Sequence, residues 1–202
     1  MESSEVCIRR LTPADAGVYR GIRLEGLERH PEAFGSTFEA ETVRPLAWFF
    51  DRLSRSTVFG AFRHTEILGV AGFAVRSGEK EAHKGLLWGM YVRPQARGTG
   101  VARRLVETVI EAARPSVELL QLSVVVGNER ARRLYAGLGF VEYGIERNSL
   151  KQSGCYYDEI LMALDLVCAA GQDRGVAPEA ASQAISRHSL EPHPPPALPH
   201  IG

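Results

Sequence analysis

The chain has 202 residues, which suits one domain with or without an appendage, and 45% of them are apolar, which excludes a wholly disordered chain. Lysine plus arginine balances aspartate plus glutamate at 24 each, which argues against a nucleic-acid partner, because phosphate binding usually leaves a basic excess. Three widely spaced cysteines predict neither a disulfide framework nor a metal site, and no apolar run approaches the ~20 residues of a membrane helix. Residues 1–5 are polar, unlike a signal peptide, so we expect a cytoplasmic protein that contacts no membrane.

The first half of the sequence predicts a strand, two helices and three strands. Apolar residues between 6 and 11 indicate the first strand. Thr12 followed by Pro13 marks a helix start, and this helix should turn Val18, Ile22 and Leu27 toward the core. The elements expected next are a helix over 43–53 and strands over 57–63, 66–76 and 82–92.

The second half predicts a further alternation of helices and strands. From Gly100 an amphipathic helix extends to Pro115. Residues 119–126 form a near-continuous apolar run, which is typical of a strand buried on both faces. Asn128 caps the next helix, which Gly139 ends. The last strands are expected over 140–143 and 155–164.

The end of the chain differs in composition from the rest. Residues 187–202 hold five of the eleven prolines and three of the six histidines. Proline continues neither a helix nor a central strand. We therefore divide the chain into a folded domain, residues 1–167, and a tail, residues 168–202, whose histidines have no predicted ligand role.

The segment between Tyr91 and Ala102 is the most informative about function. A strand ends there, a turn with two glycines follows, and a helix begins at once. The first N–H groups of a helix lack partners and lie at the positive end of its dipole, so they bind anions and phosphate above all. Gly98 and Gly100 let the backbone approach the phosphate oxygens, and Arg97 adds a cation.

Neither common nucleotide-binding motif fits this turn. A dinucleotide-binding turn has a third glycine where this chain has Arg103, and a P-loop continues with lysine and then serine or threonine. Taken alone, the turn is also compatible with a strand-to-helix connection that binds no ligand.

Two motifs in sequence order resemble those of the GNAT (Gcn5-related N-acetyltransferase) superfamily. Residues 97–102, Arg-Gly-Thr-Gly-Val-Ala, are similar to its pyrophosphate-binding signature, Arg/Gln-x-x-Gly-x-Gly/Ala. Residues 128–140 are similar to its Asn-x-x-Ala-x-x-Leu-Tyr-x-x-x-Gly-Phe segment. Residues 157–162 resemble the last strand of the family, and residues 31–38 resemble an early loop of one bacterial subgroup. The resemblance thus covers about residues 5–165.

The resemblance implies an α/β (α+β) fold: a twisted mixed sheet of about seven strands, splayed between the fourth and fifth, with about four helices around it. Acetyl-CoA would lie as co-substrate in the cleft that the splay opens, and no metal is needed. The residues that the resemblance assigns to acetyl-CoA are Met90, Tyr91 and Val92 along the pantetheine arm, Arg97, Gly98, Thr99, Gly100, Val101 and Ala102 at the pyrophosphate, Asn128 on the opposite wall, and Arg132.

The implied activity is transfer of an acetyl group from acetyl-CoA to a primary amine of a small molecule, by direct attack in a ternary complex. A backbone N–H near Val92 would stabilise the oxyanion, and Tyr135 would donate a hydrogen bond to the leaving thiolate. By periodicity alone, Tyr135 also fits the core-facing side of its helix. The alternatives are a protein N-terminal or lysine acetyltransferase and a non-catalytic acetyl-CoA-binding module. Family habit also allows a homodimer through the C-terminal strands.

The sequence leaves the general base and the acceptor pocket open. The strand that ends at Val92 has no carboxylate, unlike that of some family members. The candidate bases elsewhere are Glu39, Glu41, Asp158 and Glu159, with a water relay as the alternative. The candidates for an acceptor pocket, with ordinary core packing as the alternative, are Trp48, Phe49, Phe50, Trp88, Tyr156 and Tyr157.

Overall fold

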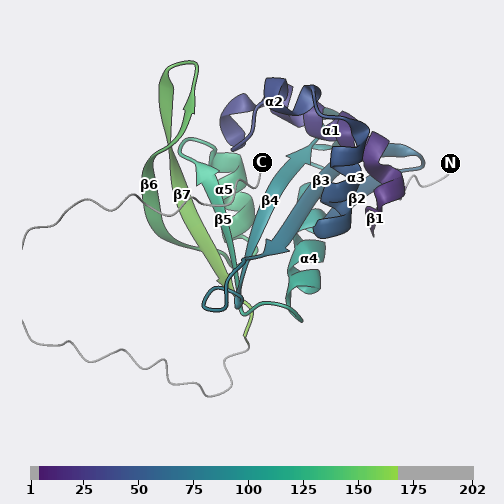
Figure 1. The fold of residues 1–202 in the computed structure, drawn as a ribbon. Helices are drawn as coiled ribbons and strands as arrows, with labels where there is room; N and C mark the ends of the chain where they lie inside the picture. Colours follow the sequence, from purple (N-terminus) through teal and green to yellow (C-terminus); the bar gives the residue numbers. More distant parts are fainter. Residues whose placement is uncertain (1–4, 168–202) are drawn as a thin grey trace, which may run out of the picture. The chain divides into compact units, whose positions relative to one another are not determined.

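In the computed structural model, which describes residues 5–167, seven strands form a mixed sheet in the order β1-β2-β3-β4-β5-β7-β6 (Figure 1). Neighbouring strands are antiparallel except β4 and β5, which are parallel. The predicted mixed α/β fold is confirmed. The predicted tail, residues 168–202, lies outside the described residues. The strands are β1 (Cys7–Arg10), β2 (Thr57–Arg63), β3 (Glu66–Val75), β4 (Lys84–Val92), β5 (Leu119–Val125), β6 (Val141–Gln152) and β7 (Cys155–Asp165).

Five α-helices occur within residues 5–167, rather than the expected four or so. None of these helices has both the length and the apolar character needed to cross a membrane. The helices are α1 (Ala16–Arg29), α2 (Phe38–Thr42), α3 (Leu46–Arg55), α4 (Val101–Ala113) and α5 (Glu129–Ala136), with three short 3₁₀ helices, η1 (Pro13–Asp15), η2 (Pro31–Ala33) and η3 (Pro94–Ala96).

The additional helix, α2, begins at a cap that was not predicted from the sequence. The Thr37 side chain accepts a hydrogen bond from the Ala40 backbone N–H at 3.2 Å, which satisfies one of the free donors at a helix start. The predicted helix over 43–53 begins only at Leu46, after Pro45 in extended conformation. Of the apolar residues at helical spacing along it, Phe49 and Leu53 are buried while Leu46 and Phe50 are exposed.

Two further expectations about single elements are wrong. Val18 is 43% exposed, and Tyr19 takes the core position on α1 instead. Strand β6 does not end at 143 but continues to Gln152, because it forms a long hairpin with β7. Most of its residues are exposed on both faces of the strand, so they give no alternation of polar and apolar residues for a sequence pattern to detect.

Two apolar cores cover the two faces of the sheet. On one face, α1 and α3 bury Ile22, Phe49 and Leu53 against the sheet. On the other face, α4 buries Leu105 and Val109 in a larger cluster that also includes side chains of α5. Because both faces are covered, functional groups must lie where strands separate or end.

The sheet opens between β4 and β5. These strands pair over three residues only, Lys84–Leu86 with Leu119–Gln121, and then diverge. Strand β4 also carries a bulge: Trp88 pairs with Gly72 and Tyr91 with Val70, so that two residues of β4 face one residue of β3. Gly89, in the bulge, has φ +66°, a left-handed conformation that glycine adopts most easily. The predicted splay between the fourth and fifth strands is therefore confirmed.

A buried ion pair joins α1 to α2. Arg23 donates through Nη2 to Glu41 Oε1 at 2.7 Å and through Nε to Oε2 at 3.0 Å, and the two side chains are 5% and 2% exposed. Burial raises the pKa of the Glu41 carboxyl, but the charges and hydrogen bonds of its arginine neighbours outweigh burial and hold that pKa below its ordinary value. Glu41 is thus a structural anion.

Replacing Glu41 by glutamine should lower the free energy of unfolding at neutral pH by about 3–5 kcal/mol, because the Arg23 charge is left buried without its partner. Urea unfolding followed by tryptophan fluorescence measures this loss. The deficit should shrink as the pH falls from about 4.3 through the lowered native pKa of Glu41, since the carboxyl of the unfolded wild-type chain is protonated first and the native carboxylate only at lower pH. Glu39→Gln, at an exposed position of the same helix, is the control and should change little; equal losses in the two variants would contradict the assignment.

Candidate active site

A cleft of about 680 Å³ lies where β4 and β5 have separated. Its walls come from both strands, from the starts of α4 and α5, and from the loop after α1. This volume is typical of a site for a small molecule or cofactor. The predicted site residues that line the cleft are Met90, Tyr91, Val92, Arg97, Gly98, Gly100, Ala102, Asn128 and Tyr135.

Three predicted cofactor residues do not line the cleft. The Thr99 hydroxyl donates to the Ala96 carbonyl at 2.7 Å, and the Val101 side chain is 1% exposed in the core, so each offers the cleft at most its backbone. Arg132 forms ion pairs with Glu129 and Glu142 instead.

The arginines of α4 and α5 that do line the cleft are Arg103 and Arg130, neither of which was predicted from the sequence as a site residue. Each lies in the first turn of a helix whose N-terminal end faces the cleft. This position in the first turn is the sequence signal that could have predicted them, because a cation there strengthens the anion binding of the free N–H groups at the helix start.

The turn before α4 has the backbone that an anion site requires. Gly98 and Gly100 have φ +80° and +84°, a region that residues with a Cβ rarely adopt. Gly100 is the N-cap of α4, and the helix begins at Val101. The first N–H groups of this helix therefore have no intrahelical partner and are available to an anion.

The end of β4 presents its backbone to the cleft. The Arg93 N–H donates to the Leu68 carbonyl of β3 at 2.9 Å. Because backbone groups alternate sides along an antiparallel ladder, those of Val92 point away from β3 and toward the gap left by β5. Consistently, the Val92 carbonyl accepts a hydrogen bond from Arg97 Nε at 3.0 Å.

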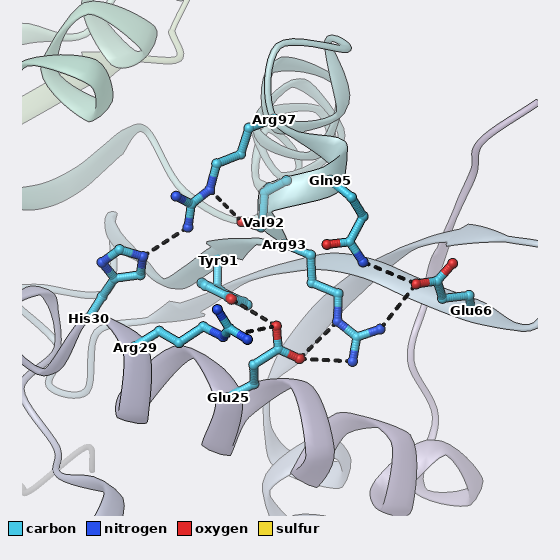
Figure 2. A network of polar contacts seen from close by, with 9 residues as sticks. All are labelled: Glu25, Arg29, His30, Glu66, Tyr91, Val92, Arg93, Gln95 and Arg97. Atoms are coloured by element: carbon cyan, nitrogen blue, oxygen red, sulfur yellow. Dashed lines mark hydrogen bonds and ion pairs between the residues drawn. The ribbon is translucent and has the colours of Figure 1, made fainter.

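Arg97 links the turn to the loop after α1 (Figure 2). Its Nη2 lies 2.8 Å from His30 Nε2. A guanidinium only donates, so His30 Nε2 must accept and the ring proton must be on Nδ1, which faces Glu32 Oε1 at 3.4 Å. His30 and Glu32 both line the cleft, and neither was predicted from the sequence as a site residue.

A second set of contacts fixes the end of β4 against α1 (Figure 2). The Tyr91 hydroxyl donates to Glu25 Oε1 at 2.9 Å, and Arg93 Nε donates to Glu25 Oε2 at 2.9 Å. Burial and the hydrogen bond to the Glu25 carboxylate raise the pKa of Tyr91 to about 12. These contacts hold the strand in place at the point where it becomes a wall of the cleft.

Tyr135 is both a core residue and a cleft residue. Its side chain is 5% exposed, and its ring packs edge-on against Phe140 with centroids 5.7 Å apart. Burial raises the pKa of its phenol. Within residues 5–167 the hydroxyl has no hydrogen-bond partner, while the residue lines the cleft. Tyr135 is thus a protonated donor with no acceptor of its own.

The four candidate bases differ in their access to the cleft. Glu41 is paired with Arg23, and Asp158 accepts from Arg147 and from the Asn148 backbone. Glu39 is exposed on α2. Glu159 accepts from the Ser123 hydroxyl at 2.6 Å, and Ser123 lines the cleft.

Of the aromatic residues considered for an acceptor pocket, only Trp88 and Tyr157 line the cleft. Phe49 is fully buried and Trp48 packs against the same core, so both are structural. Across the described residues, no group of three or more histidine, cysteine, aspartate or glutamate side chains is arranged to hold a metal ion.

Comparison with known families identifies the fold and its cleft. Residues 24–140, more than half of the chain, match the model of the acetyltransferase (GNAT) family. The chain belongs to the GNAT family. GNAT acetyltransferases are acyltransferase enzymes, so this is the enzyme class of the protein. None of the curated proteins matches the chain.

Solved structures agree with this membership. The fold is similar to a GNAT-family acetyltransferase from Streptococcus pneumoniae, with TM-score 0.70 and 22% identity over 80% of this chain and 99% of that one. It is also similar to yncA from Salmonella typhimurium, solved with its cofactor acetyl-CoA, with TM-score 0.68 and 22% identity over 84% and 98%. The ribosomal-protein-alanine N-acetyltransferase of Brucella melitensis has TM-score 0.66 and 27% identity over 79% and 99%.

The contact between Arg97 and His30 predicts one tautomer of this histidine. In a long-range ¹H–¹⁵N spectrum of the histidine rings, His30 should have its proton on Nδ1 and a bare Nε2. Arg97→Leu should convert His30 to a mixture of tautomers, while exposed His64 stays unchanged as the control. A His30 signal with its proton on Nε2 in the wild-type protein would contradict the geometry.

Proposed function

We propose that the protein transfers the acetyl group of acetyl-CoA to a primary amine of a small molecule. The observation that carries this proposal is the shape of the cleft, in which one wall is the unpaired backbone of β4 and one end is the amide-rich start of α4. An extended arm that ends in a diphosphate matches both features. The acetyl-CoA bound to yncA of Salmonella typhimurium supports the same occupant here.

The proposed roles follow the positions of the residues. The N–H groups from Gly98 to Ala102 bind the diphosphate, with Arg103 and Arg130 as additional cations, whereas the Arg97 N–H already donates to the Pro94 carbonyl at 3.1 Å. The backbone of Met90 and Val92 pairs with the pantetheine arm along the gap left by β5. The side-chain oxygen of Asn128, Oδ1, accepts a hydrogen bond from the Ala131 N–H at 3.2 Å and so caps α5. The side-chain NH₂ group of Asn128 is then left to donate to the cofactor.

The reaction needs a free amine and a stabilised thiolate. An alkyl amine has a pKa near ~10.4, so its ammonium form must first give a proton to a base or to water. The amine nitrogen then attacks the thioester carbonyl, and a backbone N–H near Val92 stabilises the oxyanion. The C–S bond breaks as the new amide forms, and the proton that the attacking nitrogen loses balances the one that the thiolate takes up. Glu159, through Ser123, is the carboxylate that we propose for the first proton transfer.

Tyr135 acts mainly as a hydrogen-bond donor to the leaving sulfur. A thiol has a pKa near ~8.5 and an ordinary phenol one near ~10, so full proton transfer from tyrosine is already unfavourable. Burial raises the pKa of Tyr135 and makes that transfer less favourable still. Donation without transfer retains the stabilising effect on the thiolate.

A second candidate function is acetylation of a protein N-terminus. It is favoured by the 27% identity with the Brucella melitensis ribosomal-protein-alanine N-acetyltransferase. Mass spectrometry after incubation with acetyl-CoA, using amine libraries in one arm and peptide libraries in the other, separates the two candidates. Binding of acetyl-CoA without thiol release for any acceptor would indicate a non-catalytic module, which the unpartnered hydroxyl of Tyr135 disfavours.

Two further proposals concern the surroundings of the enzyme. Action in the cytoplasm is supported by the composition of the sequence alone. A homodimer through β6 and β7 is supported by exposed apolar side chains on the edge strand β6, where Val141, Tyr143 and Ile145 are 69%, 54% and 53% exposed.

Gly100→Ala should weaken acetyl-CoA binding about fivefold or more, because an alanine at φ +84° costs about 1–2 kcal/mol and the amides lose their orientation. Isothermal titration calorimetry measures the dissociation constant. Gly78→Ala is a matched control, since Gly78 also has positive φ, +103°, but does not line the cleft. It should lose similar stability and keep its affinity. No heat of binding to the wild-type protein would refute the proposed cofactor.

Tyr135→Phe should lower kcat about 10- to 100-fold and leave KM for acetyl-CoA nearly unchanged, because one hydrogen bond to a developing charge is lost. Release of free thiol measures the rate. Tyr143→Phe, on the exposed face of β6, is the control and should keep full activity. An unchanged kcat in Tyr135→Phe removes this residue from the mechanism.

A further inference from the structure

A cluster of three charged side chains lies between α1, α2 and α3, and the proposed mechanism uses none of them. Arg23, Glu41 and Arg52 are 5%, 2% and 9% exposed. Two cations and one anion leave an excess positive charge. An excess charge in the interior is unfavourable unless an opposite charge comes close to it.

The second arginine of this cluster has no carboxylate within hydrogen-bond distance, and the buried hydroxyl of Tyr19 lies beside it. Arg52 Nη1 lies 3.9 Å from Glu41 Oε1, too far for a hydrogen bond. Arg52 Nε and Nη1 and the indole N–H of Trp88 are buried, and none has a hydrogen-bond partner within the described part of the chain. The Arg52 guanidinium lies over the Trp88 ring, 4.6 Å from its centroid. The cluster therefore has surplus donors as well as surplus charge.

The cluster adjoins the cleft at the bulge of β4. Trp88, Gly89 and Phe34 line the cleft, and the Arg23 guanidinium lies 5.0 Å from the centroid of the Phe34 ring. A Cβ built on Gly89 would have Arg23 Nη1 at 3.8 Å, with no other heavy atom of the described residues within 4 Å apart from adjacent residues of the chain.

Arg23 has one donor nitrogen left for a ligand. Its Nε and Nη2 donate to Glu41, while Nη1 makes no hydrogen bond within residues 5–167. The missing Cβ of Gly89 leaves space beside this nitrogen. A carboxylate is the group that matches a free guanidinium nitrogen with excess positive charge behind it.

We infer that the acceptor is a free α-amino acid, in which a carboxylate lies beside the amine. The cluster selects this acceptor, and Arg23 Nη1 is the group that binds the carboxylate. Arg52 supplies the uncompensated charge that attracts it. This inference rests on the proposed acetyl transfer to a small amine. The same charge disfavours a polyamine, which would bring a second cation toward the cluster.

Thiol release by the full chain with acetyl-CoA tests the inference on matched acceptors. Each amino acid is compared with its own carboxamide and with its decarboxylated amine. The acid should have a kcat/KM about tenfold or more above the carboxamide, the size of effect that a charge-assisted hydrogen bond gives. The comparison is stringent, because the carboxamide has the less basic amine and therefore more free base at neutral pH.

Arg52→Gln isolates the excess charge, since it leaves the Arg23–Glu41 pair intact. The ratio of kcat/KM for the acid to kcat/KM for the carboxamide should fall toward one, because the KM for the acid rises. The dissociation constant for acetyl-CoA should stay unchanged. Arg55→Gln, exposed on the same helix, is the control and should keep the ratio. If Arg52→Gln does not fold, Arg23→Lys retains the charge but loses Nη1, and the ratio should fall in the same way.

The outcomes separate the inference from the function on which it rests. Equal rates for acid and carboxamide, or faster acetylation of the decarboxylated amine, overturn the carboxylate site and leave the acetyltransferase standing. An unchanged ratio in folded Arg52→Gln and in Arg23→Lys also overturns it. If no amine releases thiol although acetyl-CoA binds, the proposed function itself fails.

Discussion

The parting of β4 from β5 after three paired residues is the constraint on which the rest of the site depends. A strand that loses its neighbour exposes N–H and C=O groups that need new partners. In this protein the contacts of Glu25 with Tyr91 and Arg93 hold the end of the strand against α1, so the gap does not close. The open ladder can therefore accept a ligand that behaves as a substitute strand.

The layer of α1, α2 and α3 has two functions that compete. As structure, it covers one face of the sheet through an apolar core. As a wall of the site, it places charged groups behind Trp88 and Gly89, where an all-apolar layer would be more stable. The Arg23–Glu41 pair offsets part of that cost, and the surplus charge of Arg52 remains for a ligand to compensate.

The sequence predicted the parts of this protein that leave a periodic or local signal. The helix start at Gly100 and the cap at Asn128 are such signals, because glycine conformation and side-chain capping are decided within a few residues. It could not predict which arginines face the cleft: Arg132 pairs with Glu142 on β6, ten positions later, while Arg130 of the same helix lines the cleft. The pairing of Arg23 with Glu41 likewise depends on how two helices meet.

The bulge at Gly89 reverses which face of the sheet the later side chains of β4 occupy. Leu87 and Val92 belong to the core on the α4 face, whereas Tyr91 belongs to the core on the α1 face together with Trp88. In an unbroken strand, side chains separated by an even number of positions share a face, so Leu87 and Tyr91 would lie together. The extra residue reverses this parity. Straightening the bulge with every residue retained would exchange the environments of Tyr91 and Val92 and detach the end of the strand from Glu25, whereas deletion of Gly89 alone would leave both side chains on their present faces.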